Sequence, residues 1–524
     1  MAKELPVEHI LKVLKSSTEG DISLIREAYA FAKKAHEGHT RYSGEPYLNH
    51  LVSVAAMLAE IGMGARTVAA GLLHDTIEDT GVDLKELRTV FGDEIAFLVE
   101  GVTKLGSVRY YGSDRHNESL RKLFVATSQD IRVLIIKLVD RLHNMKTFEH
   151  VPKEKQLRIA RETLEIYVPV AHRLGMGRLR KELEDLAFPY VYPEDHKHVV
   201  EVSRQMAKDA EAELEKTRKS LQKRLAESGL RNFHTSYRVK GTYSLFQKLK
   251  RREWDMNQVY DYLALRVVVE SLEQCYQVLG IVHDLWRPMP KRMKDYIAFP
   301  KPNGYRSLHT TVITPSKTIV EVQIRTEAMH REAEYGIASH FIYKVNELGQ
   351  KESTENTRSW FSALIPSLFR PFSWRSKKSE NESAPKELLG DKNHKAKIPQ
   401  WIQEIAEAHK SDDGSREFFD QLKDDFFSYR IFVFTPKGDV IDLPVGASPI
   451  DFAYAIHSDI GDYTSGSKVN NKLVGLDTEL KNGDIVEILT GKNNKPTRKW
   501  LDFAKTSLAR RRIRSALGMH VNGQ

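Results

Sequence analysis

The stretch GLLHDTIEDT, residues Gly71–Thr80, decides how the first part of the chain is interpreted. It follows an apolar run with helical spacing and places His74, Asp75, Glu78 and Asp79 within six consecutive positions. If the helix continues through them, His74 and Glu78 lie four residues apart, as do Asp75 and Asp79, so the groups share neighbouring faces. Carboxylates buried in such a run need a compensating cation. A metal ion is one solution, and a capped, solvated helix end is the other.

Composition indicates a protein of several domains. The chain has 524 residues, and a single core rarely exceeds roughly 250–300 residues. Hydrophobic residues make up 41% and charged residues 29%, and no apolar run approaches the length of a membrane helix. The single cysteine, Cys275, excludes a disulfide framework and a cysteine-rich zinc site. With no visible secretory signal, we expect a cytoplasmic protein without a membrane association. The net charge of +9 is compatible with nucleotide or RNA partners, and equally with a merely soluble surface.

Residues 1–191 are expected to form an all-α domain. Bundles build metal sites from side chains on different helices, and two further segments offer such side chains: RYSGEPYLNH ends in His50, and KLVDRLHNM contains Asp140. Taken singly, His50 could be a satisfied core histidine and Asp140 a partner of Arg141. Helical spacing covers Ile22–His36, Leu51–Ile61, Ala65–Ile77, Leu84–Phe91 and Leu157–Val168.

Residues 192–348 change to a mixed α+β pattern after a charged helix, Glu201–Ser228. Asp261 stands at the entry to one strand, and Glu321 lies on the polar face of another. Carboxylates from neighbouring strands can bind magnesium and organise a triphosphate. The alternative is ordinary sheet-surface acids paired with arginines. The expected strands are Ala264–Val269, Ser307–Ile313 and Lys317–Ile324, the last two forming a hairpin across Thr314–Ser316.

The remaining residues contain one more compact unit. Residues 349–398 are rich in Ser, Lys, Glu and Asn and are interpreted as a flexible linker, and 399–424 as a helical connector. Residues 425–492 give strand, turn, strand and helix, followed by two short strands, which is typical of an α+β domain. Residues 493–524 form a basic helical tail, suited either to RNA or to solvation.

The first region resembles the HD phosphohydrolase superfamily and, more narrowly, the hydrolase domain of the Rel/SpoT family of alarmone enzymes. Four ordered motifs carry the resemblance: RYSGEPYLNH, GLLHDTIEDT, GVTKL and KLVDRLHNM. It implies that His50, His74, Asp75 and Asp140 hold one divalent metal, usually manganese, which suits imidazole and carboxylate ligands without thiolate. It further implies that Glu78 and Asp79 position or deprotonate a water, that Arg41 neutralises substrate phosphate, and that Asn144 hydrogen-bonds the nucleotide.

The second region resembles the synthetase domain of the same family, which has a nucleotidyltransferase-like fold. The resemblance implies that Asp261 and Glu321 bind magnesium and help to activate a ribose hydroxyl, and that Tyr305 stacks on guanine. Arg292, Lys294 and Asp295 match the basic variant of a family motif, which agrees with a retained hydrolase. Departures from the family pattern are Gly241 for His, Lys291 for Gly and Phe341 for Trp. Nucleotide-binding residues are then Arg238, Lys240, Ser244 and Lys248 at the ATP phosphates, with Arg292, Lys294, Lys301, Asn303, Tyr305 and His309.

The third region resembles the TGS domain, a ubiquitin-like β-grasp module. The resemblance makes His457 a contact to the acceptor end of uncharged tRNA, with the ribosome as a further candidate partner. The alternative is that His457 only caps a helix end. Typical long family members continue into zinc-binding and ACT-like domains, and their absence from this sequence is interpreted as truncation or a shorter architecture.

Together these resemblances predict a bifunctional enzyme. It would transfer pyrophosphate from ATP to the 3′-hydroxyl of GDP or GTP, and hydrolyse (p)ppGpp to GDP or GTP and pyrophosphate with a metal-activated water. Two alternatives stay open: a tRNA- or ribosome-binding regulator with vestigial sites, and a hydrolase with an inactive synthetase. The sequence leaves the oligomeric state and the preference between GDP and GTP open.

Overall fold

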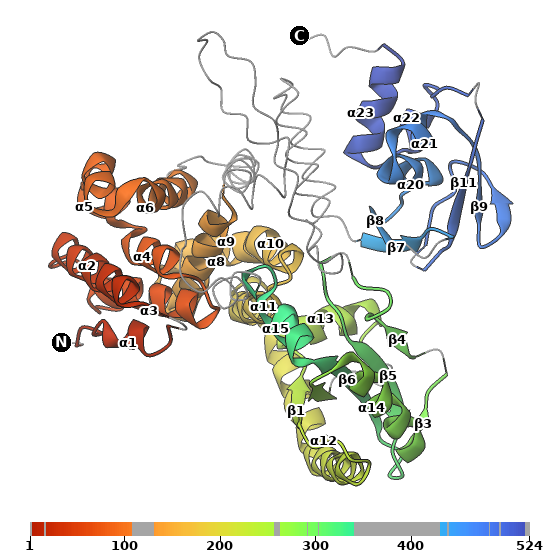
Figure 1. Ribbon diagram of the computed structural model, residues 1–524, viewed down its shortest axis with the longest axis horizontal. Helices are drawn as coiled ribbons and strands as arrows, with labels where there is room; N and C mark the ends of the chain where they lie inside the picture. Colours follow the sequence, from red (N-terminus) through yellow and green to blue (C-terminus); the bar gives the residue numbers. More distant parts are fainter. Residues whose placement is uncertain are drawn as a thin grey trace, which may run out of the picture.

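The computed structural model describes three folded parts of the chain (Figure 1). The expected linker and helical connector, residues 349–398 and 399–424, lie outside the described residues, as do Asp261, Lys291 and Phe341. The described residues are 3–14, 17–106, 130–255, 263–290, 292–301, 303–339, 430–436, 440–481, 483–491 and 494–518.

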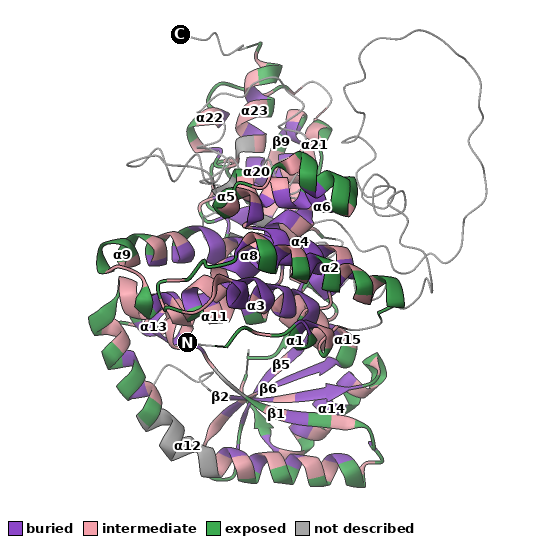
Figure 2. Cartoon of the chain, turned by 90° about the vertical axis from the view of Figure 1, so that its left-hand side faces the viewer, coloured by how far each residue is buried: buried purple, intermediate pink, exposed green. Residues whose placement is uncertain are grey.

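The first part is helical, as predicted. Its core is one large apolar cluster to which the central helices contribute Leu51, Leu72 and Leu138, each with an exposed fraction of 0%. In Figure 2 this interior is seen as the buried residues, in purple, of α3, α4 and α8. The elements are α1 Glu8–Leu11, α2 Glu19–Ala35, α3 Tyr47–Glu60, α4 Ala65–Leu73, α5 Thr76–Thr80, α6 Leu84–Gly106, α8 Ile131–Lys146, the 3-10 turn η1 Phe148–His150, α9 Lys153–Glu162, the π-helical turn η2 Thr163–Tyr167, α10 Val168–Arg173 and α11 Gly177–Val191.

The expected continuous helix Ala65–Ile77 is wrong, because the helix is broken at His74 and Asp75. Helix α4 ends at Leu73 and α5 begins at Thr76. His74 Nδ1 donates to the Gly71 carbonyl oxygen over 2.9 Å. That oxygen is the one a continuing α-helix would offer to the Asp75 amide, so the imidazole competes with the backbone ladder. The break sets His74 and Asp75 at a junction instead of on a face shared with Glu78.

The second part is a mixed sheet with helices on it. Its strands run in the order β1-β2-β6-β5-β3, with β4 paired to β5. Strand β2 is parallel to β6, and β5 is antiparallel to β6, which confirms the predicted hairpin. Helices α12 and α14 bury apolar side chains such as Leu221 and Val278 against one face of the sheet, and α12 runs along its outer side in Figure 2. The elements are α12 Pro193–Glu227, β1 Phe233–Val239, α13 Thr242–Arg251, β2 Leu263–Val269, α14 Leu272–Leu285, β3 Arg287–Pro288, β4 Lys294–Asp295, β5 Leu308–Ile313, β6 Ile319–Thr326 and α15 Glu327–Tyr335.

The helical and sheet parts are joined through α11, α13 and α15. Just after α15, the Ile337 amide donates to the Leu174 carbonyl oxygen over 2.9 Å. The residue before it, Gly336, has φ of 55°, and a Cβ atom there would overlap the Leu174 carbonyl. At the other contact, Asp185 of α11 accepts hydrogen bonds at the start of α13 from Thr242 Oγ1 and the Tyr243 amide. We call these contacts between the helical and sheet parts the joint. The backbones approach so closely there that larger side chains would not fit.

The third part is the small α+β unit that the sequence predicts. Its sheets are β10-β9-β11 and the hairpin β7-β8, bridged between Phe434 and Ile485. The expected basic helix in the tail is α23, and its apolar side, Ala509 and Ile513, packs with Tyr454 of α20. The tail is therefore part of this unit's core. The elements are β7 Arg430–Phe434, β8 Val440–Pro444, α20 Pro449–Ile456, α21 Ser458–Asp462, β9 Thr464–Val469, β10 Lys472–Val474, β11 Val486–Thr490, α22 Trp500–Phe503 and α23 Ser507–Ala516.

Among the described residues, none of the helices combines the length and the apolar character needed to cross a membrane.

Candidate metal centre and nucleotide-binding sheet

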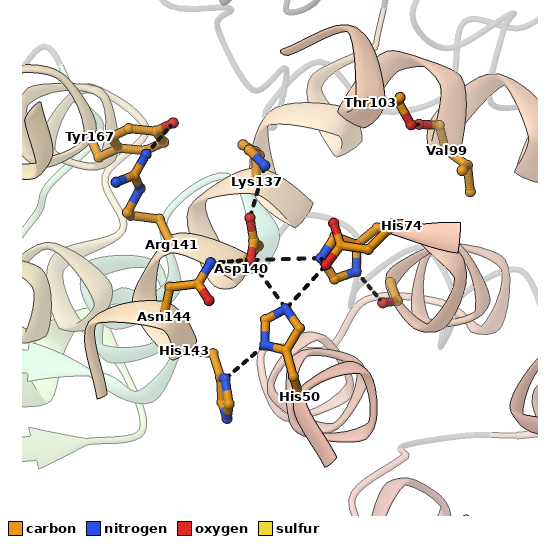
Figure 3. Close-up of polar contacts among 12 residues, drawn as sticks. His50, His74, Val99, Thr103, Lys137, Asp140, Arg141, His143, Asn144 and Tyr167 are labelled. Carbon is orange, nitrogen blue, oxygen red and sulfur yellow. Dashed lines mark hydrogen bonds and ion pairs between the residues drawn. The ribbon is translucent and has the colours of Figure 1, made fainter. Parts of the chain in front are cut away.

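The four predicted metal ligands lie together in the helical part. His50 comes from α3, His74 from the end of α4 and Asp140 from α8 (Figure 3). Asp75 follows His74 at the α4–α5 junction. Ligand atoms of His50, His74 and Asp140 all lie within 4.8 Å of one another. Asp75 Oδ2 is 3.0 Å from His74 Nε2 and 3.5 Å from His50 Nε2. Three helical elements that are distant in sequence thus deliver one cluster of imidazole and carboxylate groups.

The arrangement fits a divalent metal. Because His74 Nδ1 donates its proton to Gly71, Nε2 is the ring nitrogen that points into the cluster and that would offer its lone pair to a metal. His74 Nε2 is buried, and it faces the carboxylates of Asp75 at 3.0 Å and Asp140 at 3.7 Å. An imidazole nitrogen that faces two carboxylates in a protein interior is an arrangement that a bound cation can occupy. A set of two imidazoles and two carboxylates suits manganese, iron or zinc.

The charges in the cluster also favour a bound cation. Burial alone would lower the pKa of His74, but Asp75 and Asp140 raise it to about 10. Burial opposes ionisation of Asp140, yet Lys137 and the histidines hold the pKa of its carboxyl well below the ordinary range. Lys137 Nζ lies 2.9 Å from Asp140 Oδ2. Two buried carboxylates therefore gather positive charge around them, which is the role that a metal cation would take over.

Glu78 and Asp79 stand on α5, directly after the ligand pair, and both are exposed. Desolvation of its carboxyl group by the surrounding protein raises the pKa of Glu78, Lys137 opposes the shift, and Asp75 and Asp79 add to it. A carboxyl group with a raised pKa beside a metal centre suits proton transfer.

Arg41 and Asn144, the residues expected to meet substrate, are hydrogen-bonded to each other. The Arg41 guanidinium donates to Asn144 Oδ1, and its other amino group lies 3.2 Å from His143 Nδ1. Asn144 Nδ2 donates to Asp140 Oδ1 over 2.6 Å. Asn144 thus contacts the predicted ligand Asp140 directly, whereas Arg41 reaches the ligands only through Asn144 and His143.

Sequence reasoning missed three side chains that support the ligands: Tyr47, Lys137 and His143. Tyr47 donates to Asp75 Oδ2 over 2.8 Å, and His143 Nδ1 lies 2.8 Å from His50 Nδ1. Tyr47 stands three residues before His50, and His143 three residues after Asp140. Helical spacing places each pair on one face, so this signal was present in the sequence.

On the sheet, Glu321 meets a chain of polar side chains. Glu321 Oε1 lies 2.7 Å from His309 Nδ1, and His309 Nε2 lies 2.8 Å from the Tyr305 hydroxyl. Lys301 Nζ is 5.3 Å from the centre of the Tyr305 ring. The structure therefore brings together four of the residues expected at the nucleotide site, while the Asp261 position and the Arg238 side chain lie outside what it describes.

The other expected nucleotide contacts are spread around this group. Ser244 on α13 donates to Glu184 Oε2 over 3.0 Å, and Lys248 lies on the same helix. Lys294 pairs with His309 across β4 and β5, and Arg292 precedes β4. Asn303 Nδ2 donates to the His172 carbonyl oxygen over 3.3 Å, so this residue also touches the helical part.

The departure Gly241 has a structural reason. A Cβ atom at Gly241 would lie 2.8 Å from Asp185 Oδ2 and 2.9 Å from Oδ1, which is closer than real Cβ atoms approach. Glycine lets α13 begin directly against the carboxylate of α11.

Comparison with known proteins follows the same three parts. Residues 28–177 match the HD domain, residues 237–348 the region found in RelA / SpoT proteins, and residues 431–490 the TGS domain. A guanosine-3′,5′-bis(diphosphate) 3′-pyrophosphohydrolase from Aquifex aeolicus is 41% identical over 98% of this chain and 67% of its own length. The chain belongs to the RelA/SpoT family. Other relatives are a GTP pyrophosphokinase from Myxococcus xanthus, 42% identical over 97% of this chain and 62% of its own, and the bifunctional (p)ppGpp synthase/hydrolase SpoT of Escherichia coli, 40% identical over 95% and 65%.

This RelA/SpoT chain spans about three fifths of the length of several of these curated relatives. The matched regions confirm the predicted fold class: a helical HD domain, an α+β synthetase-type domain and a TGS domain.

In the TGS domain, His457 lies between α20 and α21, and its side chain is 64% exposed. Its Nδ1 accepts a hydrogen bond from the Asp459 amide over 3.2 Å. The side chain thus caps the start of α21. Capping of a helix end is the alternative role that the sequence left open for His457, and the capped end is the start of the following helix. In the same domain, the turn between β9 and β10 contains Asn470 and Asn471, whose φ values of 51° and 65° are a conformation that asparagine tolerates.

Proposed function

We propose that this RelA/SpoT chain both makes and degrades (p)ppGpp. The observation that supports the proposal most is the buried cluster of His50, His74, Asp75 and Asp140, beside Arg41 and Asn144. A second polar group around Glu321 on the sheet supports a separate synthetic site.

In hydrolysis, His50, His74, Asp75 and Asp140 would hold one manganese ion. When bound, the metal supplies Lewis acidity, which makes a water more acidic and polarises the scissile phosphate. Glu78, with its raised pKa, and Asp79 orient the attacking water and accept its proton. Arg41 neutralises substrate phosphate, and Asn144 hydrogen-bonds the nucleotide while it holds Asp140. The products are GDP or GTP and pyrophosphate.

In synthesis, Asp261 and Glu321 would bind magnesium with ATP. The ribose 3′-oxygen of GDP or GTP attacks the β-phosphorus of ATP, the bond from that phosphorus to the α-bridging oxygen breaks, and AMP leaves. Glu321 or Asp261 accepts the hydroxyl proton. His309 and Tyr305 hold Glu321 in place through their hydrogen bonds. Tyr305 stacks on guanine, while Lys240, Ser244 and Lys248 contact the ATP phosphates.

The partners of the TGS domain belong to the same proposal. Uncharged tRNA would meet His457, whose exposed ring leaves one nitrogen available after capping α21. The enzyme would work in the cytoplasm, where its nucleotide substrates are found.

Product analysis tests the proposal. The chain is incubated with ATP and GDP or GTP and magnesium, and separately with ppGpp with and without manganese. We expect AMP and (p)ppGpp in the first reaction, and manganese-dependent release of pyrophosphate in the second. Asp75→Ala should abolish hydrolysis, and Glu321→Ala should abolish synthesis. A regulator with vestigial sites would turn over neither substrate, and a hydrolase with an inactive synthetase would show the second reaction alone.

A further inference from the structure

We propose that His143 is a positioning residue of the metal centre, which fixes the tautomer and the orientation of the ligand His50 and is itself fixed by Arg41. The inference rests on the proposed metal-dependent hydrolysis. It assigns a role to a half-buried imidazole that the proposed mechanism does not otherwise use.

The hydrogen bonds determine where the protons lie. His143 Nδ1 and His50 Nδ1 are 2.8 Å apart, so one nitrogen donates and the other accepts. Arg41 lies 3.2 Å from the same His143 nitrogen, and a guanidinium can only donate. His143 Nδ1 is therefore the acceptor of both bonds, and the proton between the two rings belongs to His50 Nδ1.

This assignment leaves His50 with the tautomer that a metal ligand needs. With a proton on Nδ1, Nε2 carries the lone pair, and Nε2 is the atom that lies 3.4 Å from Asp140 and 3.5 Å from Asp75. Metal-bound histidines commonly donate their second ring nitrogen to such a partner, and the bond fixes the ring plane. His50 is 1% exposed, so solvent cannot replace His143 as acceptor.

Arg41 holds a second ligand in the same way. One of its amino groups reaches His143, and the other donates to Asn144 Oδ1, whose amide donates to Asp140. Two successive residues of α8 thus connect one guanidinium to two metal ligands, His50 and Asp140. Because Arg41 is also the residue expected to meet substrate phosphate, a phosphate that draws it away loosens both ligands together.

Two substitutions at His143 separate hydrogen bonding from packing. His143→Leu fills the space without an acceptor, whereas His143→Asn keeps an acceptor oxygen close to the position of Nδ1. Manganese affinity is measured by calorimetric titration of the metal-stripped full chain. We expect His143→Leu to weaken manganese binding by about 10–100-fold, and His143→Asn to stay within about threefold of the parent.

The outcomes are distinguishable. If the parent chain binds no manganese, the proposed metal centre itself is wrong. If the parent binds and His143→Leu binds equally well, or if His143→Asn loses as much affinity as His143→Leu, the positioning role is overturned. Thermal unfolding in chelator shows whether His143→Leu folds. If it does not, Arg41→Met is decisive, because it removes the donor and leaves the His143 ring in the chain. A several-fold weaker manganese affinity supports the positioning role, and an unchanged affinity overturns it.

Discussion

At the scale of single residues, the helical core holds charge in an apolar interior. Asp140 is 4% exposed and is paired with Lys137, whose side chain is 13% exposed. A buried ion pair is costly to break from one side, because the remaining charge stays unpaired. The same carboxylate also becomes a ligand if a metal binds.

Lys137→Met therefore tests the charge balance of the centre. Without metal, the substitution should destabilise the chain by about 3–5 kcal/mol, seen as a lower unfolding midpoint in chelator. With saturating manganese the decrease should be smaller, because the cation compensates Asp140. Lys146→Met, which breaks a half-exposed pair with Glu182, is the control and should cost under about 1 kcal/mol. Equal decreases for Lys137→Met with and without manganese would contradict the account.

His36 gives the helical part a defined response to acid. Its ring stacks on Tyr47 with 4.9 Å between ring centres, and burial lowers its pKa to about 4 from 6.5. Between about pH 6.5 and pH 4 the unfolded chain binds a proton that the folded chain does not, so stability falls as the pH falls, by about 1.4 kcal/mol per pH unit.

His36→Phe keeps the stack and removes this titration. Measured by urea unfolding in chelator at pH 7, 6 and 5, the variant should lose less stability than the parent on acidification. Parallel losses in the two proteins would show that His36 does not contribute.

Ordered motifs in the sequence pointed to four residues that the structure brings together. His50, His74, Asp75 and Asp140 meet because three helical segments converge, and their role as metal ligands stays a prediction. The sequence did not identify Tyr47 and His143 as supports of the ligands, because their role depends on hydrogen bonds to Asp75 and His50 that only the structure shows.

At the scale of elements, the structure differs from the sequence pattern in two places: where one helix ends, and how much of one strand face is exposed. The apolar period runs through His74, but its ring captures the Gly71 carbonyl and ends α4. On the polar face of β6, Glu321 belongs to the candidate nucleotide site, whereas Gln323 and Arg325 are covered and are 3% and 1% exposed. Helix α15 packs on β6 and β2, and its Glu334 pairs with Arg325. Alternation predicts which residues share a face, but it does not predict what covers that face.

The joint between the first two domains depends on a glycine. Gly336→Ala would place a side chain at a positive φ and against the Leu174 carbonyl, and should lower stability by about 2 kcal/mol or more. Gly280→Ala is the matched control: it lies within α14 with open space around it and should stabilise by about 0.5–1 kcal/mol. Calorimetric unfolding of both variants checks the pair, and a neutral Gly336→Ala would contradict the close approach.

At the scale of the whole molecule, the two candidate sites are connected through contacts at the joint. Asn303, expected at the nucleotide site, donates to His172 of the helical domain, and Asp185 of α11 accepts from Thr242 at the start of α13. On the side of the helical domain, these contacts come from α10 and α11. They could not be predicted, because they depend on how two domains meet.

We expect nucleotide at one site to weaken binding at the other, since running both reactions together would only consume ATP. Affinity for ppGpp at the metal centre, measured with a non-hydrolysing Asp79→Asn chain, should fall when an ATP analogue and GDP are present. Linkage requires the reciprocal loss to be equal, and unchanged affinities would exclude coupling.

The most direct test of two separate sites measures both reactions in one variant of each site. Asp140→Asn and Glu321→Gln are each assayed for synthesis from ATP and GDP and for manganese-dependent hydrolysis of ppGpp. The account predicts that Asp140→Asn loses hydrolysis by more than about 100-fold and keeps synthesis, and that Glu321→Gln does the reverse. A variant that loses both reactions, or neither, would contradict it.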